Sequence, residues 1–216
     1  MSTRAHTATR PRGIRRSEAR RRAIRRRRIA AIVGTAIVVG FVVALAWPSF
    51  HQAVREIALP LRHEDIIRQQ ARDKGLDPSL IAAVIYAESH FRDGQTSGAG
   101  AEGLMQITPA TARMIARKSG GVAFTVEDLG TPQVNIAYGS WYLRYLMRRY
   151  AGNQTFALAA YNGGEGNVDR WIDRARQRNA DLTIAAIPFS ETRTYVQRVL
   201  AAERQYRSSY AHELGL

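Results

Sequence analysis

The sequence predicts a mainly α-helical domain behind a single N-terminal transmembrane helix. A stretch of 19 residues without a charge, 29–47, directly follows an arginine-rich tail. From residue 63 onward, apolar residues recur at helical spacing, and Pro, Gly, Asp and Thr stand where helices should begin or end. No segment alternates apolar and polar residues as a half-exposed strand does. These three observations point to one compact helical domain and one membrane segment.

The positive charge of the chain is concentrated at its N-terminus. The formal net charge is +14, but residues 1–28 hold 12 Arg and one acid, so the remainder carries only +3. The tail has no apolar pattern, and we expect it to be disordered and cytoplasmic. Binding of DNA or anionic lipid by this tail is an alternative, but we expect a topology determinant and no nucleic-acid partner. The absence of cysteine excludes disulfides, thiolate metal sites and a cysteine nucleophile.

Residues 29–47 have the length of a membrane span. At 1.5 Å per residue they would extend about 28 Å, close to the ~30 Å hydrocarbon core of a bilayer. Trp47 suits the interface, and the Arg block predicts a cytoplasmic N-terminus with the rest of the chain outside the cytoplasmic membrane. Cleavage as a signal peptide near Ala46, giving a secreted protein, is the alternative. Residues 48–62 are predicted to be a linker and 63–210 the folded domain.

Seven helices are expected in this domain. Asp77-Pro78 and Thr108-Pro109 each combine a capping side chain with a proline at the first helical position. Trp141, Tyr142, Tyr145 and Leu146 lie in a strongly apolar segment and are expected in the core. The predicted helices are 63–74, 78–91, 109–118, 132–150, 154–161, 167–177 and 191–209.

Glu88 is a lone carboxylate at the end of the most apolar predicted helix. Ile81, Val84, Ile85 and Glu88 fall at positions i, i+3, i+4 and i+7, and therefore share one face. Burial and the C-terminal end of the helix dipole both raise the pKa of a carboxyl group. A carboxylic acid that keeps its proton near neutral pH can protonate a glycosidic oxygen. From this helix alone, the simpler interpretation is that Glu88 is the first solvated residue beyond the core.

The following loop is rich in glycine and returns to the core at Gln106. Its glycines allow close approach to a ligand. A buried glutamine needs a hydrogen-bond partner, which indicates a ligand or a catalytic group near Gln106.

Four sequence blocks occur in order along the domain. They are Glu88-Ser89-x-Phe91 with Ser97 and Gly100-Ala101-x-Gly103-Leu104-Met105-Gln106; Asn135-Ile136 with Gly139 and Tyr142-Leu143; Ala159-Ala160-Tyr161-Asn162-Gly163-Gly164-x-Gly166-Asn167-Val168; and Glu191-Thr192-Arg193-x-Tyr195-Val196. Together they resemble the signature of the soluble-lytic-transglycosylase-like domain of the lysozyme-like superfamily. The resemblance covers about residues 63–205. Gln95, Thr108 and Gly163 depart from the family pattern, and none of them replaces a catalytic group.

The resemblance implies a goose-type-lysozyme-like helical fold and an enzyme of peptidoglycan. Such an enzyme cleaves the β-1,4 bond between N-acetylmuramic acid and N-acetylglucosamine and leaves a 1,6-anhydromuramoyl end. Glu88 would be the single acid and base, and Tyr195 would orient it. No cofactor is implied, and the partners would be glycan strands and the membrane. The substrate-binding residues implied by the resemblance are Ser97, Gln106, Tyr161, Asn162 and Glu191.

Two other functions remain open at this stage. A lysozyme-type hydrolase would need a second carboxylate, for which Asp93 is the candidate. An inactive glycan-binding scaffold would not need both Glu88 and Tyr195. A metal enzyme is not indicated, because no pair of histidines has the spacing of a metal site. His90 is expected to be exposed, since it lies two residues from Glu88 along a helix.

Overall fold

The computed structural model describes residues 57–120 and 125–216, with parts of 21–47. The chain divides into two compact units, Met1–Arg55 and Glu56–Leu216. The individual positions described in the first unit are 21, 24–26, 28–29, 31–36, 38–45 and 47.

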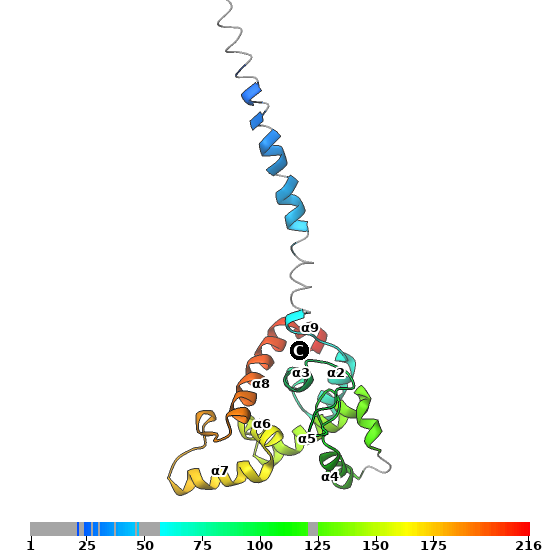
Figure 1. Ribbon diagram of the computed structural model, residues 1–216, viewed down its shortest axis with the longest axis vertical. Coiled ribbons are helices and arrows are strands. Elements are labelled where there is room, and N and C mark those ends of the chain that lie inside the picture. The colour runs from blue at the N-terminus through cyan, green and yellow to red at the C-terminus, as the bar shows by residue number, and fades with distance from the viewer. Residues whose placement is uncertain are drawn as a thin grey trace, which may run out of the picture. The chain divides into compact units, whose positions relative to one another are not determined.

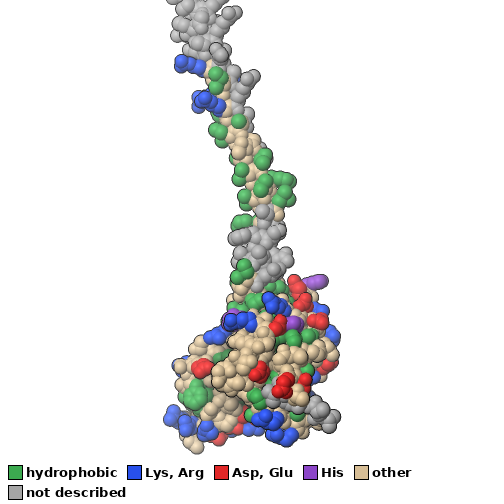
Figure 2. Space-filling model, turned by 45° about the vertical axis from the view of Figure 1, so that its right-hand side comes forward, with side chains coloured by type: hydrophobic (Ala, Val, Ile, Leu, Met, Phe, Trp, Pro, Cys, Tyr) green, Lys and Arg blue, Asp and Glu red, His purple; other side chains and the backbone are tan. Residues whose placement is uncertain are grey.

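The first unit contains an apolar helix of 22 residues, Ile24–Leu45, with a mean hydropathy of 2.3 and no buried part. Its apolar side chains are exposed along the described length (Figure 2). This helix is long and apolar enough to cross a membrane, and a signal sequence would meet the same criterion. It begins inside the segment 1–28 for which we expected no regular structure, because arginine is a good helix former. Residues 1–20 and 48–56 lie outside the described part of the chain.

The second unit is built from helices, as predicted (Figure 1). All seven expected helices are confirmed, with bounds that differ by a few residues. Sequence reasoning missed the short α9 and two 3-10 helices. Within 57–120 and 125–216 the only extended pairings are single bridges in the loop before α4. The elements are α2 (Glu64–Lys74), α3 (Pro78–Ser89), α4 (Pro109–Ser119), η1 (Val126–Gly130), α5 (Pro132–Arg149), α6 (Gln154–Gly163), α7 (Glu165–Gln177), η2 (Ile184–Ala186), α8 (Ser190–Ser209) and α9 (Ala211–Leu214).

Helix α3 is the central helix of the unit and packs between α8 and α2 (Figure 1). Its residues from Leu80 to Ile85 are at most 3% exposed. We expected one buried face, but a helix that is apolar all round is buried all round. Asp77 begins the helix as predicted, with its carboxylate accepting a hydrogen bond of 2.8 Å from the Ser79 amide. The helix therefore carries Glu88 out of the centre of the core.

The end of α3 differs from the sequence prediction by two residues. We expected the helix to continue to Phe91, but it ends at Ser89, and His90 and Phe91 have φ values of 52° and 59°. Two successive left-handed residues without glycine are uncommon, and such conformations often occur near functional sites. His90 is exposed, as predicted.

Residues 57–62 belong to the folded unit and not to a linker. Leu59 is buried, and three tyrosine hydroxyls from α3 and α8 donate hydrogen bonds to backbone carbonyls of this segment. The expected boundary at residue 63 was therefore too late. Sequence reasoning could not find this, because the partners lie far away in the chain. The bonds are Tyr86 Oη to Ala58 O (3.2 Å), Tyr206 Oη to Pro60 O (2.5 Å) and Tyr210 Oη to Leu59 O (2.8 Å).

Candidate active site

Glu88 lies in the last turn of α3 and is half-buried. Burial raises the pKa of its carboxyl group from 4.5 to about 7, and interactions with Tyr195 and Arg198 oppose the rise. Desolvation is the largest of these effects, because the charged form loses water that the core does not replace. The carboxyl group can thus hold a proton near neutral pH, whereas the helix pattern alone favoured a solvated residue at this position.

Tyr195 comes from α8 and meets Glu88 across the contact between α8 and α3. Its hydroxyl group is buried. Among the described residues, no atom meets the geometry of a full hydrogen bond to it. The hydroxyl nevertheless interacts with the Glu88 carboxyl group and lowers its pKa. We interpret the contact as a long, poorly aligned hydrogen bond. Catalytic hydrogen bonds are often of this kind before substrate binds.

Arg198 stands one turn after Tyr195 on α8 and was not found by sequence reasoning. Its positive charge lowers the pKa of Glu88. It also lowers the pKa of His90, after the larger effect of burial. Its only sequence signal is the spacing of three residues from Tyr195, which places both on neighbouring positions of one helix face.

Replacing Arg198 with Gln should move the pH dependence of the reaction. Removing the cation takes away one of the two effects that hold the Glu88 pKa down, so the pKa should rise. The loss of activity at alkaline pH should then occur at a higher pH than in the unmodified chain. A pH profile of kcat/KM from pH 5 to 9 measures this shift. Arg204→Gln, at another position of α8, should leave the profile unchanged, and equal shifts in both variants would contradict the assignment.

The loop that faces the end of α3 is held by one buried asparagine of α5. Asn135 Oδ1 accepts a bond of 2.7 Å from the Met105 amide. Asn135 Nδ2 donates bonds of 2.8 and 2.9 Å to the carbonyls of Glu102 and Leu129. The side chain thus uses its acceptor and one donor to fix the loop, and its other donor to bind η1. Sequence reasoning placed Asn135 in a family block but gave it no role.

Met105 packs directly onto Gly139 of α5. A Cβ atom at Gly139 would come within 2.7 Å of the Met105 Cβ and 2.4 Å of its sulfur. The first of these contacts cannot be relieved by rotating the Met105 side chain. Glycine is therefore required there so that the loop can lie against the helix.

Gly139→Ala should destabilise the protein by about 1–3 kcal/mol, as overpacking does. Gly166→Ala is the matched control, because it is also a helical glycine but its Cβ would only touch a side-chain end of Arg170 at 3.6 Å. That change should be neutral or stabilise by up to about 1 kcal/mol. Urea unfolding of both variants measures the difference, and equal effects would contradict the packing argument.

Three of the predicted substrate-binding residues hold the protein together as well. Tyr161 donates a hydrogen bond of 2.8 Å to the Met105 carbonyl, so its hydroxyl proton is not free for a sugar. Gln106 donates its amide protons to the carbonyls of Gln95 and Gly103, at 2.9 and 2.8 Å. Both hydrogen-bond partners of Gln106 therefore lie in the loop between α3 and α4.

Ser97 also has a structural contact, but it keeps its proton. Its hydroxyl accepts a bond of 3.0 Å from the Ala101 amide, which closes a tight turn. Each of the three side chains therefore retains part of its bonding capacity: the Ser97 proton, the Gln106 carbonyl oxygen and the lone pairs of the Tyr161 hydroxyl.

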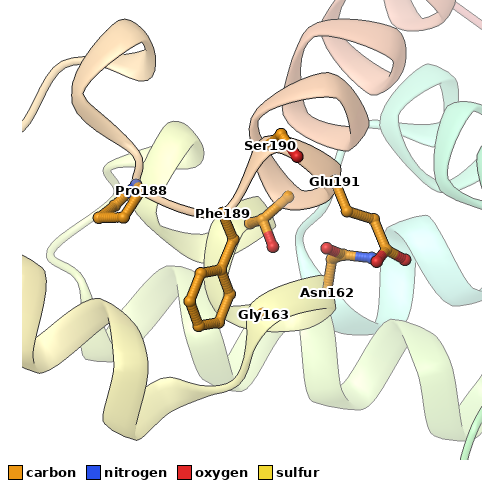
Figure 3. A pocket seen from close by; sticks show the side chains of 7 residues that line it. Asn162, Gly163, Pro188, Phe189, Ser190 and Glu191 are labelled. Carbon is orange, nitrogen blue, oxygen red and sulfur yellow. The ribbon is translucent and has the colours of Figure 1, made fainter.

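Asn162 and Glu191 line a pocket of about 490 Å³ between the end of α6 and the start of α8. In Figure 3 the Asn162 amide and the Glu191 carboxylate lie together at one end, and the Phe189 ring at the other. Glu88 does not line this pocket. Glu191 precedes Tyr195 by one turn of α8, and Tyr195 meets Glu88. The pocket therefore lies next to the Glu88 carboxyl group along α8.

Asp93, the candidate second carboxylate, contacts other residues than Glu88. Its Oδ1 atom lies 2.8 Å from His63 Nε2, and its Oδ2 atom lies 4.0 Å from Arg62 Nη1. These partners come from the segment that leads into α2. The described residues contain no group of three or more His, Cys, Asp or Glu that could hold a metal ion. Glu88 is therefore a stronger candidate for acid–base chemistry than Asp93.

Comparison with known proteins gives consistent results. The family model of the transglycosylase SLT domain matches residues 65–184. The soluble lytic murein transglycosylase of Salmonella typhimurium is 36% identical over 159 residues, covering 70% of this chain and 24% of that protein. The membrane-bound lytic murein transglycosylase C of Glaesserella parasuis is 33% identical over 168 residues, covering 68% of this chain and 46% of that protein.

Solved structures share the fold. An inactive mutant of the lytic transglycosylase Slt from Pseudomonas aeruginosa has a TM-score of 0.66 and 35% identity, over 73% of this chain and 26% of that one. The 70 kDa soluble lytic transglycosylase of Escherichia coli also has a TM-score of 0.66, with 34% identity over 71% of this chain and 25% of that one. The chain thus spans about a quarter of these relatives. Through the match to more than half its length, it belongs to the transglycosylase SLT-domain family.

Proposed function

We propose that the chain is a peptidoglycan lytic transglycosylase anchored to the cytoplasmic membrane. The observation that carries this proposal is Glu88, a half-buried carboxyl group with a pKa of about 7 beside the Tyr195 hydroxyl. Membership of the SLT-domain family supports it, as do the names of relatives that include soluble and membrane-bound lytic murein transglycosylases.

The reaction needs one carboxyl group in two successive roles. Protonated Glu88 gives its proton to the glycosidic oxygen between N-acetylmuramic acid and N-acetylglucosamine, and the bond from that oxygen to the muramoyl anomeric carbon breaks. The resulting carboxylate then takes the proton from the muramoyl 6-hydroxyl group, whose oxygen bonds to the same carbon. The products are an N-acetylglucosamine end and a 1,6-anhydromuramoyl end, and Glu88 regains its proton.

Attack by a hydroxyl group of the substrate itself removes the need for a second carboxylate. An intramolecular nucleophile has a high effective concentration, so it needs little further activation. A hydrolase would require a water molecule positioned by another carboxylate. The contacts of Asp93 with His63 and Arg62 favour the transglycosylase over that alternative.

We assign supporting roles to the residues around Glu88. Tyr195 would orient the carboxyl group. Ser97 would donate its free proton to the sugar chain, and Gln106 and Tyr161 would accept hydrogen bonds from it, according to the capacities left by their structural contacts. Asn162 and Glu191 would bind a further part of the glycan in the neighbouring pocket.

The helix Ile24–Leu45 is proposed to anchor the enzyme, with the N-terminus in the cytoplasm and the catalytic unit outside. The arginine block before the span supports this orientation. Cleavage near Ala46 would instead release a secreted enzyme. The mass of the mature protein in its native membrane distinguishes the two.

Mass spectrometry of digested peptidoglycan tests the activity. A fragment of residues 50–216 keeps the segment 57–62 that the tyrosines hold, and it is compared with its Glu88→Gln variant. We expect products with anhydro ends, one water lighter than hydrolytic products and absent with the variant. Reducing ends would identify a hydrolase. Binding of glycan without any product would identify a scaffold.

A further inference from the structure

A second hollow, of about 180 Å³, lies between the end of α2 and the middle of α5. It shares no lining residue with the pocket of Asn162 and Glu191 or with the surroundings of Glu88. Nothing in the proposed reaction uses it. Its lining residues are Asp73, Lys74, Trp141, Arg144, Tyr145 and Arg148.

Two aromatic rings form one wall of this hollow. Trp141 and Tyr145 are four residues apart on α5, and their rings are nearly parallel, 5° apart with centroids at 5.7 Å. We expected both in the core, but both are only half-buried. Tyr142 and Leu146 are buried, as predicted. The stacked, half-buried rings give one side of the hollow an apolar surface, against which the C–H face of a pyranose ring can pack.

The remaining lining is mostly cationic. Lys74, Arg144 and Arg148 face one acid, Asp73, so the hollow carries an excess of two positive charges. Between residues 57 and 216, wherever the structure describes side chains, no carboxylate lies within ion-pair distance of these three cations. Lys118 adds a further charge, with its ammonium group 5.1 Å from the Tyr145 ring centroid. The positive charge is therefore not neutralised by the protein.

Arg144 carries a buried donor without an acceptor. Its Nη1 donates a long bond of 3.4 Å to the Gly75 carbonyl at the end of α2, which holds the side chain in place. Its Nε is buried and has no hydrogen-bond partner within the described chain. Buried donors of this kind are rare and call for an explanation. An anionic oxygen of a ligand would satisfy it, in the charge-assisted geometry that guanidinium groups favour.

The hollow is connected to the candidate active site through packed rings. The ring centroids of Tyr145 and Tyr142 are 6.2 Å apart, and those of Tyr142 and Tyr161 are 5.3 Å apart. Burial and then the charge of Glu88 raise the pKa of Tyr161. The hydroxyl of Tyr145 also donates a bond of 3.0 Å to Glu165 at the start of α7. A ligand in the hollow would contact α5, the same helix whose Asn135 holds the loop between α3 and α4.

We propose that this hollow binds an anionic sugar, one pyranose ring that carries a carboxylate or a phosphate group. The ring would lie on Trp141 and Tyr145, and the anion would pair with Arg144 and Arg148. A volume of 180 Å³ corresponds to roughly six water molecules, which is enough for one pyranose ring. The site does not depend on the chemistry of Glu88 and would exist if the proposed reaction were wrong.

Binding of small sugars to the full chain in detergent micelles tests the proposal. Ligand-observed NMR titrations would use N-acetylmuramic acid, N-acetylglucosamine 6-phosphate, neutral N-acetylglucosamine and inorganic phosphate. We expect at least one charged sugar to bind about tenfold or more tightly than the neutral sugar and than inorganic phosphate. Arg144→Gln with Arg148→Gln should weaken the charged sugar about tenfold. The preference between carboxylate and phosphate then identifies the natural anion.

The control is a double variant with the same change of charge at another hollow. Arg174 and Arg178 line a hollow of about 300 Å³ beside Trp171, where the indole is buried. Arg174→Gln with Arg178→Gln should leave binding of the charged sugar unchanged. The proposal is overturned if no charged sugar binds, if the neutral sugar or inorganic phosphate binds equally well, or if both double variants weaken binding equally. Because binding is measured and not cleavage, these outcomes are separate from failure of the proposed function.

Discussion

Replacing Glu88 with Gln is expected to stop cleavage of peptidoglycan and, at pH 8, to make the protein more stable. Loss of a general acid lowers the rate by about 10²–10⁴. Glutamine has nearly the same shape and no charge to desolvate, so the core around it should be preserved. The two effects together would show that the carboxyl group is kept at this position for chemistry and at a cost in stability.

The gain in stability should depend on pH in a defined direction. The Glu88 pKa is about 7 in the folded chain and 4.5 in the unfolded chain. The folded state therefore binds the proton more tightly. The favourable contribution is complete below pH 4.5 and is lost as the pH rises through 7. Above pH 7 the charged form is disfavoured by on the order of 3 kcal/mol, since each pKa unit corresponds to 1.36 kcal/mol. Glutamine does not titrate and avoids this loss.

Thermal unfolding of both forms at pH 5 and pH 8 measures the effect. The variant should gain stability relative to the unmodified chain as the pH increases. Glu127→Gln is the control, because Glu127 is exposed in η1 and should alter neither activity nor the pH dependence of stability. A Glu88→Gln protein that keeps full activity, or that shows the same stability difference at both pH values, would contradict the assignment.

The sequence predicted those parts of the fold that depend on neighbours in the chain. Asp77-Pro78 and Thr108-Pro109 start helices because a capping side chain and a proline act within one turn. The end of α3 was placed wrongly, since the left-handed His90 and Phe91 carry no local signal such as glycine. The segment 57–62 was assigned to a linker because its hydrogen-bond donors are up to 151 residues away.

The residues of the candidate site also divide into those that the sequence predicted and those that it did not. Glu88 was found from its place on an apolar helix, and the structure gives it the raised pKa that this position implies. Tyr195 came from resemblance, and Arg198 had no signal beyond its distance along the helix. Trp141 and Tyr145 looked like core residues, because an apolar helix does not reveal which of its faces a neighbour leaves uncovered.

Asn135→Ala is expected to cause the second large effect, a loss of stability together with a loss of activity. The change leaves the Met105 amide and the Leu129 carbonyl without their partner, whereas the Glu102 carbonyl keeps its bond of 3.0 Å from the Ile107 amide. Each buried group without a hydrogen bond costs about 1–3 kcal/mol, so a loss of at least about 2 kcal/mol is expected. Gly103 packs against the same side chain, so its truncation also leaves a gap beside the loop.

Asn153→Ala provides the comparison for an asparagine with one bond. Asn153 caps α6 by accepting a bond of 3.0 Å from the Phe156 amide, and its loss should cost about 1 kcal/mol without affecting activity. Urea unfolding gives the two stability changes, and hydrogen exchange shows where they act. In Asn135→Ala the amides of residues 95–107 should lose protection before the rest of the domain, because the loop loses its connection to α5. Uniform loss of protection would mean that Asn135 supports the core in general, and unchanged activity would mean that the loop does not need α5 to serve Glu88.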